Sequence, residues 1–488
     1  MPELTGITLL GLGPGNPKQI TREAWDVLNS VPEVYLRTSR HPLVSAFPAS
    51  LKVHSFDHIY ESEAQFETVY ARIVSEVLEL GARPGGVVYA VPGAPFVAET
   101  TAPEIARRAR QAGIPVRIVQ GLSFVEPLLA VLGEDLLPQL SIVDALDVLE
   151  QHHPLFPPHA PALVAQVYSR QVAGDLKITL MAQYPDEHAV RLVHAAGTAD
   201  ELVEELPLHA IDHSEQIGVL TALYVPALGP NTSFEEFQEL IAHLRAPEGC
   251  PWDREQTHLS LRRNLIEEAY EVLAALDQED PAAMQEEFGD LLVQVVLHAQ
   301  IATEDGEFRM SDVLHGIISK LIHRHPHVFG DVQAEDAETV IANWEQIKAG
   351  ERAAQGTQRG ILDGVSVALP ALSQAEAYTA RAARVGFEWP NLEGVQGDVA
   401  EEMREFEEAE TPEDREAEYG DVLFAWVNLA RWLKIDPEAA LRAANARFRE
   451  RFAYVEQGAR SQGRQLSEMS LQEMDALWDE AKQILKKT

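Results

Sequence analysis

The sequence predicts a multidomain protein in which an α/β half precedes an all-α half with an internal repeat. Three observations support this fold class. The chain has 488 residues, more than one hydrophobic core normally organises, so we expect two to four domains. Short β-rich runs alternate with helical stretches up to about residue 225, as in α/β domains. Beyond that point the strand signals fade and long helical patterns follow one another.

The α/β prediction for the first half depends on short runs of residues that favour strands. The predicted strands are residues 7–10, 86–91, 116–119, 176–180 and 219–225. Between them, residues 66–80 and 102–112 show the apolar spacing of amphipathic helices.

The best domain boundary is the segment 226–233, Pro-Ala-Leu-Gly-Pro-Asn-Thr-Ser, which ends in a capping-type Ser233 before Phe234. The residues beyond it predict helices at 233–245, 257–277, 281–304, 310–324, 335–349, 370–384, 394–409, 411–433, 436–460 and 470–486. The polar residues 350–366, with four glycines, predict an exposed linker. The expected domains are residues 1–226, 234–350 and 367–488.

Composition restricts the classes of partner. The chain carries 39 basic and 77 acidic residues, a formal charge of −38, which argues against non-specific binding to nucleic acid or an anionic membrane. Small anionic substrates stay possible, because a bound metal reverses the local sign of charge. No run of about 18 apolar residues predicts a membrane helix, and the first residues lack the pattern of a signal peptide. Cys250 is the single cysteine, which fits a reducing cytoplasm.

Two clusters of carboxylates, built alike, dominate the second half. In each, two glutamates three apart are followed, one helix later, by a glutamate and an aspartate three apart. The first set is Glu268, Glu271, Glu287 and Asp290, and the second is Glu402, Glu405, Glu418 and Asp421. Residues three apart share a helix face, so two antiparallel helices would aim four carboxylates into one gap. Four like charges there favour a bound cation, and oxygen ligands suit Mg²⁺ or Mn²⁺ beside phosphate.

The two clusters belong to an internal repeat. Glu268 corresponds to Glu402 and Asp290 to Asp421, at offsets of 134 and 131 residues. Other residues match in the same order: Trp252 and Trp389 before the acidic pairs, and Lys320 with Arg324 and Arg447 with Arg451 after them. Matching acidic, basic and aromatic positions make coincidence a poor explanation.

These residues would permit nucleotide hydrolysis. Mg²⁺ held by carboxylates neutralises charge on phosphate oxygens. Glu401, beside Glu402, is a candidate to orient or deprotonate the attacking water. Arg447 and Arg451, one helical turn apart, are candidates to clamp a phosphate tail. Trp389 is a candidate to stack on a base, and a role in the core is an equal alternative.

Longer motifs accompany the acidic pattern. They are Gly-Cys-Pro-Trp-Asp at 249–253, Arg-His-Pro-His-Val-Phe at 324–329, Trp-Glu-Gln-Ile-Lys at 344–348 and Val-Gly-Phe-Glu-Trp at 385–389. With these motifs, roughly residues 234–488 resemble the MazG family of nucleoside triphosphate pyrophosphohydrolases. The resemblance implies an all-α tandem MazG helical-bundle region. It also implies Mg²⁺ (or Mn²⁺) binding, conversion of an NTP or dNTP to its monophosphate and pyrophosphate by water attack at the α-phosphorus, and a homodimer.

The resemblance further implies that the second unit is catalytic. Its metal ligands would be Glu402, Glu405, Glu418 and Asp421, and its phosphate-side segment contains Asn445, Arg447 and Arg451. Arg447 replaces the usual Lys, while Glu450 and Asp398 stand where a second Arg and a Lys are common. The first unit keeps its acidic set with Lys320 and Arg324, so we treat it as a second candidate metal site or a structural or regulatory unit.

A glycine-rich turn, Gly-Leu-Gly-Pro-Gly at 11–15, follows the first strand without a Walker lysine. With Ala-Val-Pro-Gly-Ala-Pro at 90–95 and Gln-Gly-Leu-Ser-Phe at 120–124, it resembles class III tetrapyrrole (corrin/porphyrin) methylases over about residues 5–225. The resemblance implies two α/β lobes with S-adenosylmethionine in the cleft between them. The residues that would line this cleft are Gly11, Gly13, Gly15, Pro92, Gly93, Gly121 and Ser123. Ala94 stands where active members often carry a polar residue.

The leading hypothesis is therefore a nucleoside triphosphate pyrophosphohydrolase that acts on small-molecule nucleotides. A second hypothesis makes the protein mainly an S-adenosylmethionine-dependent methyltransferase with a helical oligomerisation module. A third treats the helical half as a non-enzymatic oligomerisation unit whose acidic clusters are solvated faces, and the repeat makes it the weakest. The sequence does not distinguish among the bases of the nucleotide.

Overall fold

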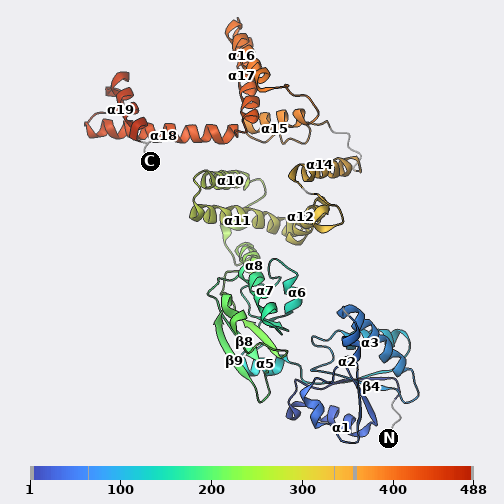
Figure 1. Ribbon diagram of the computed structural model, residues 1–488. Helices are drawn as coiled ribbons and strands as arrows, with labels where there is room; N and C mark the ends of the chain where they lie inside the picture. Colours follow the sequence, from blue (N-terminus) through green and yellow to red (C-terminus); the bar gives the residue numbers. More distant parts are fainter. Residues whose placement is uncertain (1–4, 64, 335, 355–359, 485–488) are drawn as a thin grey trace. The chain divides into compact units, whose positions relative to one another are not determined.

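The computed structural model describes residues 5–63, 65–334, 336–354 and 360–484 (Figure 1). The chain folds as two compact units, residues 1–243 and 244–488. The first unit is α/β and the second is helical. The predicted order of an α/β half before an all-α half is therefore confirmed.

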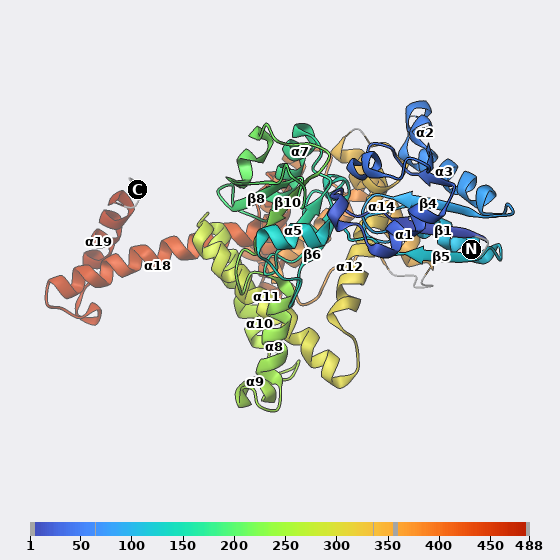
Figure 2. The same cartoon turned by 90° about the horizontal axis from the view of Figure 1, so that it is seen from below.

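The first lobe of the α/β unit is a parallel sheet of β1 (Ile7–Gly11), β2 (Glu33–Leu36), β3 (Lys52–Ser55), β4 (Val87–Val91) and β5 (Val116–Val119), in the order β3-β2-β4-β1-β5. Figure 2 shows β1, β4 and β5 beside one another. Helices α2 (Asp57–Ser62), α3 (Phe66–Gly81) and α4 (Thr101–Gln111) pack on one face, against Leu9 and Tyr89. Helix α1 (Arg22–Ser30) packs on the other face, against Leu10 and Ala90, because side chains alternate along a strand.

The second lobe is a mixed sheet in the order β6-β7-β10-β8-β9. Its strands are β6 (Ser141–Asp144), β7 (Ala162–Ala165), β8 (Ala189–His194), β9 (Leu202–Pro207) and β10 (Thr221–Val225). Helices α6 (Ala145–Leu149) and α7 (Arg170–Met181) cover one face, and α5 (Val125–Leu132) covers the other. Only β6 and β7 pair in parallel; the remaining pairs among the described strands of this sheet are antiparallel.

One predicted strand is wrong. Residues 176–180 lie inside α7. Ser169 caps this helix by accepting a hydrogen bond from the Val172 amide, and the buried Val172, Leu176 and Leu180 recur every four residues along one face. The run of apolar residues was short enough to fit either structure, and the helical face of the surrounding residues decides it.

The helical unit consists mostly of long helices. They are α8 (Phe234–Arg245, which crosses the boundary between units), α9 (Pro251–Glu255), α10 (Arg262–Asp277), α11 (Pro281–Asp305), α12 (Met310–Arg324), α13 (Pro326–Phe329), α14 (Ala337–Ala354), α15 (Ala371–Arg384), α16 (Leu392–Glu408), α17 (Pro412–Trp432), α18 (Pro437–Ser461) and α19 (Leu471–Ile484). Three of the long helices begin with a capping side chain followed by proline, at Asp280, Thr411 and Asp436. Helices α10 and α11 form one hairpin, and α16 and α17 form its counterpart.

The predicted linker at 350–366 is shorter than expected. Helix α14 continues to Ala354, where Glu351 forms an ion pair with Arg324 of α12. Residues 355–359 lie outside the described part of the chain, and Gly360–Ser366 form turns. None of the described helices combines the length and the hydropathy that a membrane-crossing segment needs.

Candidate metal centres

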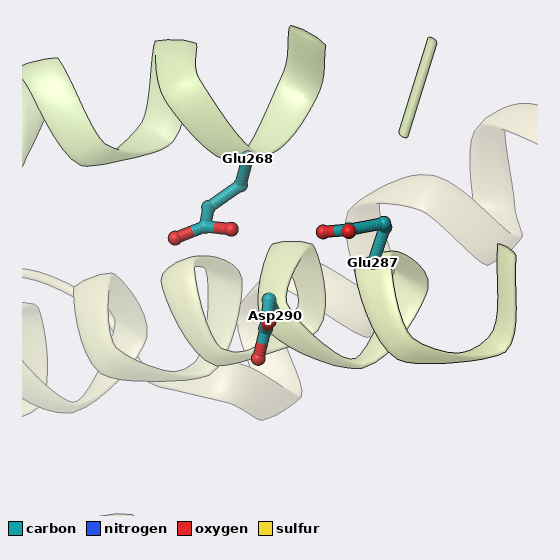
Figure 3. A group of neighbouring side chains, drawn as sticks. All are labelled: Glu268, Glu287 and Asp290. Carbon is teal, nitrogen blue, oxygen red and sulfur yellow. The ribbon is translucent and has the colours of Figure 1, made fainter. Parts of the chain in front are cut away.

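The first carboxylate cluster forms where α10 packs against α11. Glu268 of α10 and Glu287 and Asp290 of α11 each offer an oxygen atom, and these oxygens all lie within 4.8 Å of one another. Figure 3 shows Glu268 reaching from α10 toward α11, with Glu287 reaching toward it. Partial burial and then the charges of Asp290, Glu271 and Glu287 raise the pKa of Glu268. The predicted ligand Glu271 lies outside the group of three, close enough to contribute to this shift.

The second cluster repeats this geometry between α16 and α17. Oxygens of Glu402, Glu418 and Asp421 lie within 4.8 Å of one another. Burial, then the charges of Asp421, Glu405, Asp398 and Glu418, raise the pKa of Glu402. The predicted ligand Glu405 therefore stands beside the group, as Glu271 does in the first repeat.

The chemistry of both clusters fits a divalent metal ion. Among the described residues, none of these six carboxylates forms an ion pair with a Lys, Arg or His side chain. Burial, and then the repulsion of neighbouring carboxylates, raise the pKa of Glu268, Glu287 and Glu402. Three or four carboxylates at such spacing are the hard oxygen donors that Mg²⁺ or Mn²⁺ prefers. The residues needed to hold the ion are therefore in place.

Two further candidates lie at the start of the second cluster. Glu401 is exposed, and its carboxylate lies 3.8 Å from Arg404. Trp389 packs against the first turn of α16, where a Cβ added to Gly394 would come within 3.0 Å of the indole ring. Trp389 is 42% exposed, and its side chain forms a hydrogen bond with Asp398. Burial and then the charge of Glu401 raise the pKa of Asp398, and the hydrogen bond from Trp389 partly offsets this rise. Trp389 is thus at the rim of the cluster and outside the core.

In the first repeat, the predicted phosphate-side arginine is neutralised by a carboxylate. Arg324 donates hydrogen bonds to both oxygens of Glu351, at 2.7 and 3.3 Å, and this contact lowers the pKa of Glu351. The Arg324 guanidinium also lies over the ring of Trp344, 5.9 Å from its centre.

The second repeat places its arginine in the same way but without a carboxylate. Arg451 lies 5.8 Å from the centre of the Trp478 ring, and its Nε is buried without a hydrogen-bond partner. Trp478 and Lys482 correspond to Trp344 and Lys348, at an offset of 134 residues. This offset would have identified Trp478 from the sequence. The same offset carries Glu351 to Leu485, which lies outside the described residues and has no charge.

The remaining basic and amide candidates have no fixed partner. Lys320 of α12 and Asn445 and Arg447 of α18 are exposed, and none of them forms a hydrogen bond or ion pair through its side chain among the described residues. In particular, no hydrogen bond or ion pair among the described residues joins any of them to the carboxylates of its own repeat. The structure therefore brings together the carboxylates of each predicted site, and the predicted basic and amide residues are not bonded to them.

In the α/β unit, the three glycine-containing turns meet at the carboxyl edge of the first sheet. Gly13 and Gly93 exchange backbone hydrogen bonds of 3.1 and 2.9 Å. A Cβ on Gly11 would come within 2.7 Å of the Gly93 oxygen and the Gly121 nitrogen, so these backbones need glycine to approach one another.

The other predicted cleft residues lie near the same edge, and two of them are held by local contacts. Gly15 has a φ of 125° and lies against Pro42. Ser123 is buried, accepts a hydrogen bond from the Val125 amide and donates one to Glu126. Pro92 lies between β4 and Gly93, at the same edge of the sheet. The carboxyl edge of a parallel sheet is where such folds bind ligands, and the adjacent His41 has a buried Nδ1 without a partner.

Comparison with known proteins accounts for both units. The MazG nucleotide pyrophosphohydrolase domain matches residues 256–329, which contain the first cluster, and the family of tetrapyrrole (corrin/porphyrin) methylases matches residues 6–212. The uncharacterized protein YabN of Bacillus subtilis is 42% identical over 490 residues, 98% of each chain.

Two named enzymes match about half of the chain. The nucleoside triphosphate pyrophosphohydrolase/pyrophosphatase MazG of Thermotoga maritima is 45% identical over 249 residues, 51% of this chain and 95% of that protein. The nucleoside triphosphate pyrophosphohydrolase of Escherichia coli K12 is 44% identical over 249 residues, 50% of this chain and 94% of that protein. The chain therefore belongs to the MazG family of nucleoside triphosphate pyrophosphohydrolases, and carries a tetrapyrrole methylase domain ahead of its helical half.

Proposed function

We propose that the helical half hydrolyses nucleoside or deoxynucleoside triphosphates to the monophosphate and pyrophosphate, with Mg²⁺ or Mn²⁺ as the resident cation. The observation that carries this proposal is the pair of carboxylate groups whose oxygens lie within 4.8 Å and have no basic partner among the described residues. The names of the relatives in Thermotoga maritima and Escherichia coli support the same activity.

In the second repeat, Glu402, Glu405, Glu418 and Asp421 would hold the cation. When bound, the cation supplies positive charge that neutralises phosphate oxygens as the transition state forms. The protein itself orients the reactants. Glu401, exposed beside the cluster, accepts a proton from the water whose oxygen attacks the α-phosphorus, and the bond from that phosphorus to the bridging oxygen breaks to release pyrophosphate.

The basic residues of α18 stabilise the phosphates from the other side. Asn445 and Arg447 are exposed and without partners among the described residues, so they are available to donate hydrogen bonds to phosphate oxygens. Arg451 already lies against Trp478, which restricts its rotamers and lowers the entropic cost of binding. Trp389, at the rim of the cluster, offers a ring on which a base stacks.

We assign catalysis to the second repeat and metal binding without turnover to the first. The reason is electrostatic: Glu351 neutralises Arg324, whereas no carboxylate neutralises Arg447 or Arg451 among the described residues. A triphosphate needs positive charge on the protein in addition to the cation. Of the two basic residues predicted for the first repeat, only Lys320 has no carboxylate partner among the described residues.

The direct test mixes the purified chain with each NTP or dNTP and Mg²⁺ and identifies the products. We expect the monophosphate and pyrophosphate in equal amounts, and Arg447→Ala should lower kcat/KM by about 10- to 100-fold, the loss of one charge-assisted phosphate contact. Release of orthophosphate would contradict the proposed reaction. Full activity of Arg447→Ala would contradict the proposed role of Arg447 in binding phosphate. Lys434→Ala, an exposed lysine in the turn before α18, is the matched control.

A second activity is favoured by the three glycine turns at one sheet edge. We propose that Gly11, Gly13, Gly93 and Gly121 let the backbone approach S-adenosylmethionine, with a methyl acceptor of unknown class. Calorimetry with S-adenosylhomocysteine tests this, and Gly13→Trp should abolish the binding. An absence of binding would leave the α/β unit as a scaffold.

The expected setting and assembly follow from charge and surface. A net charge of −38 and one cysteine support a cytoplasmic protein whose partners are nucleotides, with neither nucleic acid nor membrane. Exposed apolar side chains along α12, among them Ile318, Leu321 and Ile322, support a homodimer that covers them. Light scattering would report a mass near twice 54.0 kDa if this is correct.

A further inference from the structure

Two histidines of the first repeat face each other across the entrance to α10. His258 lies between α9 and α10, and His298 lies on α11. Their Nδ1 atoms are 2.7 Å apart, and their rings are nearly parallel, with an interplanar angle of 7°. The Nε2 atoms of both rings are buried without a hydrogen-bond partner. The pair joins the segment that leads into α10 to the middle of α11.

An arginine also holds the same segment, and its guanidinium forms an ion pair with a carboxylate of α11. Arg245 of α8 donates hydrogen bonds to the carbonyl oxygens of Asp253 and Gln256, and it forms an ion pair with Glu304 of α11 at 2.7 Å. The same segment also carries the charged residues Asp253, Arg254 and Glu255 of α9 and Arg262 of α10. Among the described residues, none of these groups forms a hydrogen bond or ion pair with either ring, and the charge that lowers the pKa of His298 is that of His258.

The hydrogen bond between the rings limits how many protons the pair can hold. One Nδ1 must carry a proton and the other must be bare. A second proton there would make one ring a cation and would set two N–H groups against each other in place of the hydrogen bond. The ring with the bare Nδ1 already carries its proton at a buried Nε2, and protonation of the other Nε2 would bury a second N–H without an acceptor, together with a positive charge. Burial and the neighbouring His258 accordingly lower the pKa of His298.

We propose that His258 and His298 are a positioning pair for the first carboxylate cluster, which holds the start of α10 against α11 until acidification separates the rings. Glu268 is ten residues beyond His258 on α10, and Glu287 and Asp290 precede His298 on α11. Release of the helix start lets Glu268 move away from its two partners. The inference rests on the proposed function only in that the first cluster binds metal.

The second repeat lacks this histidine pair. His298 corresponds to Leu429, at the offset of 131 residues that relates Asp290 to Asp421. A leucine side chain makes no hydrogen bond and does not titrate. The entrance to α16 should therefore keep the same stability across the pH range in which the entrance to α10 loosens.

The direction of the pH effect follows from the lowered pKa. A histidine in an unfolded chain takes up a proton near pH 6.5, whereas His298 in the folded chain takes one up only at a lower pH. Below about pH 6.5 the open state therefore binds more protons than the closed state. The stability that the pair contributes is complete above this pH and is lost as the pH falls.

Hydrogen–deuterium exchange of the full chain measures this opening. Between about pH 7.5 and about pH 5.5, after correction for the intrinsic exchange rate, residues 256–264 should exchange about tenfold faster, while residues 390–398 should not change. His298→Asn keeps an amide near the position of Nδ1 and cannot titrate, so its segment should stay protected at both values. Equal protection of the wild-type segment at both pH values would overturn the proposal, whether or not the variant folds.

Metal binding distinguishes positioning from a purely structural role. The parent chain for this test carries Glu402→Gln, which disables the second cluster. Calorimetry measures the affinity of this parent and of its His298→Asn variant for Mn²⁺ at both pH values. Protonation of the carboxylates lowers the affinity of both proteins, so the fall should be about tenfold larger in the parent, which keeps the histidine pair. Equal falls in the variant and its parent would contradict positioning. These experiments use no nucleotide, so a failure of hydrolysis leaves their outcome unaffected.

Discussion

The two repeats of the helical half share their acidic residues and differ in the surroundings of their basic residues. Each gathers three carboxylates from a helical hairpin, and each sets an arginine about 6 Å from the centre of a tryptophan ring. Arg324 is then neutralised by Glu351, whereas the position equivalent to Glu351 in the second repeat is Leu485. The carboxylates to which we assign a cation are thus common to both repeats, whereas the surroundings of the arginines to which we assign the triphosphate differ. A cluster of carboxylates is weak evidence for catalysis unless a nearby basic residue is also free of a carboxylate.

The largest expected effect comes from neutralising each cluster in turn. Glu402→Gln with Glu405→Gln should lower the rate of monophosphate formation by about 100-fold or more, because the cation loses its ligands. Glu268→Gln with Glu271→Gln, the matched change in the first repeat, should leave the rate within about threefold. Rates measured at saturating Mg²⁺ and nucleotide decide between the repeats. The reverse result would move catalysis to the first repeat, the one that the family model matches.

Metal should stabilise both repeats. At a concentration about 100 times its Kd, a bound ion adds about 2.7 kcal/mol to the free energy of unfolding, or roughly 5–10 °C in the Tm of a unit of this size. Scanning calorimetry with Mg²⁺ and with a chelator measures the shift. Glu268→Gln and Glu402→Gln should each remove a part of it, and together they should remove it all. A shift that survives the double change would place the metal elsewhere.

Release of Arg324 should make the first repeat resemble the second. Glu351→Leu removes the carboxylate that neutralises this arginine, and we expect nucleotide to bind the first repeat about 3- to 10-fold more tightly. Calorimetry with an NTP in the Glu402→Gln background isolates the first site. Glu407→Leu, an exposed change on α16, should have no such effect. Unchanged affinity after Glu351→Leu would show that the ion pair is not what distinguishes the repeats.

The smallest effect concerns the chain without metal. Because the folded state raises the pKa of Glu402, this group stabilises the fold below its unfolded pKa, near 4.5, and that contribution is lost as the pH rises. Glu402→Gln should therefore raise the metal-free Tm at neutral pH by roughly 1–3 °C and leave it unchanged under acidic conditions. A lower Tm at neutral pH would mean that the carboxylate makes a stabilising contact in the absence of metal.

Local spacing made much of the fold and the candidate site predictable. Glu287 with Asp290 and Glu418 with Asp421 share a helix face because they are three apart, and proline after a capping residue marks where α11 and α17 begin. The same reasoning failed for residues 176–180, where a short apolar run carries no information about its partners. It also gave no sign of β2, β3 and β6 to β9, whose runs are too short to stand out.

The amino-acid sequence by itself determined the order of an α/β half before a helical half, the internal repeat and the acidic motif, since each depends on residues close together in the chain or on matching residues at similar offsets. Tertiary structure decided which carboxylates meet, that Trp389 lies at the rim of the second cluster, that Glu351 neutralises Arg324 and that His258 meets His298. These contacts join residues on different helices, and their geometry depends on how the helices pack. Periodicity fixes a residue's face on its own helix, whereas only packing determines the partner that this face meets.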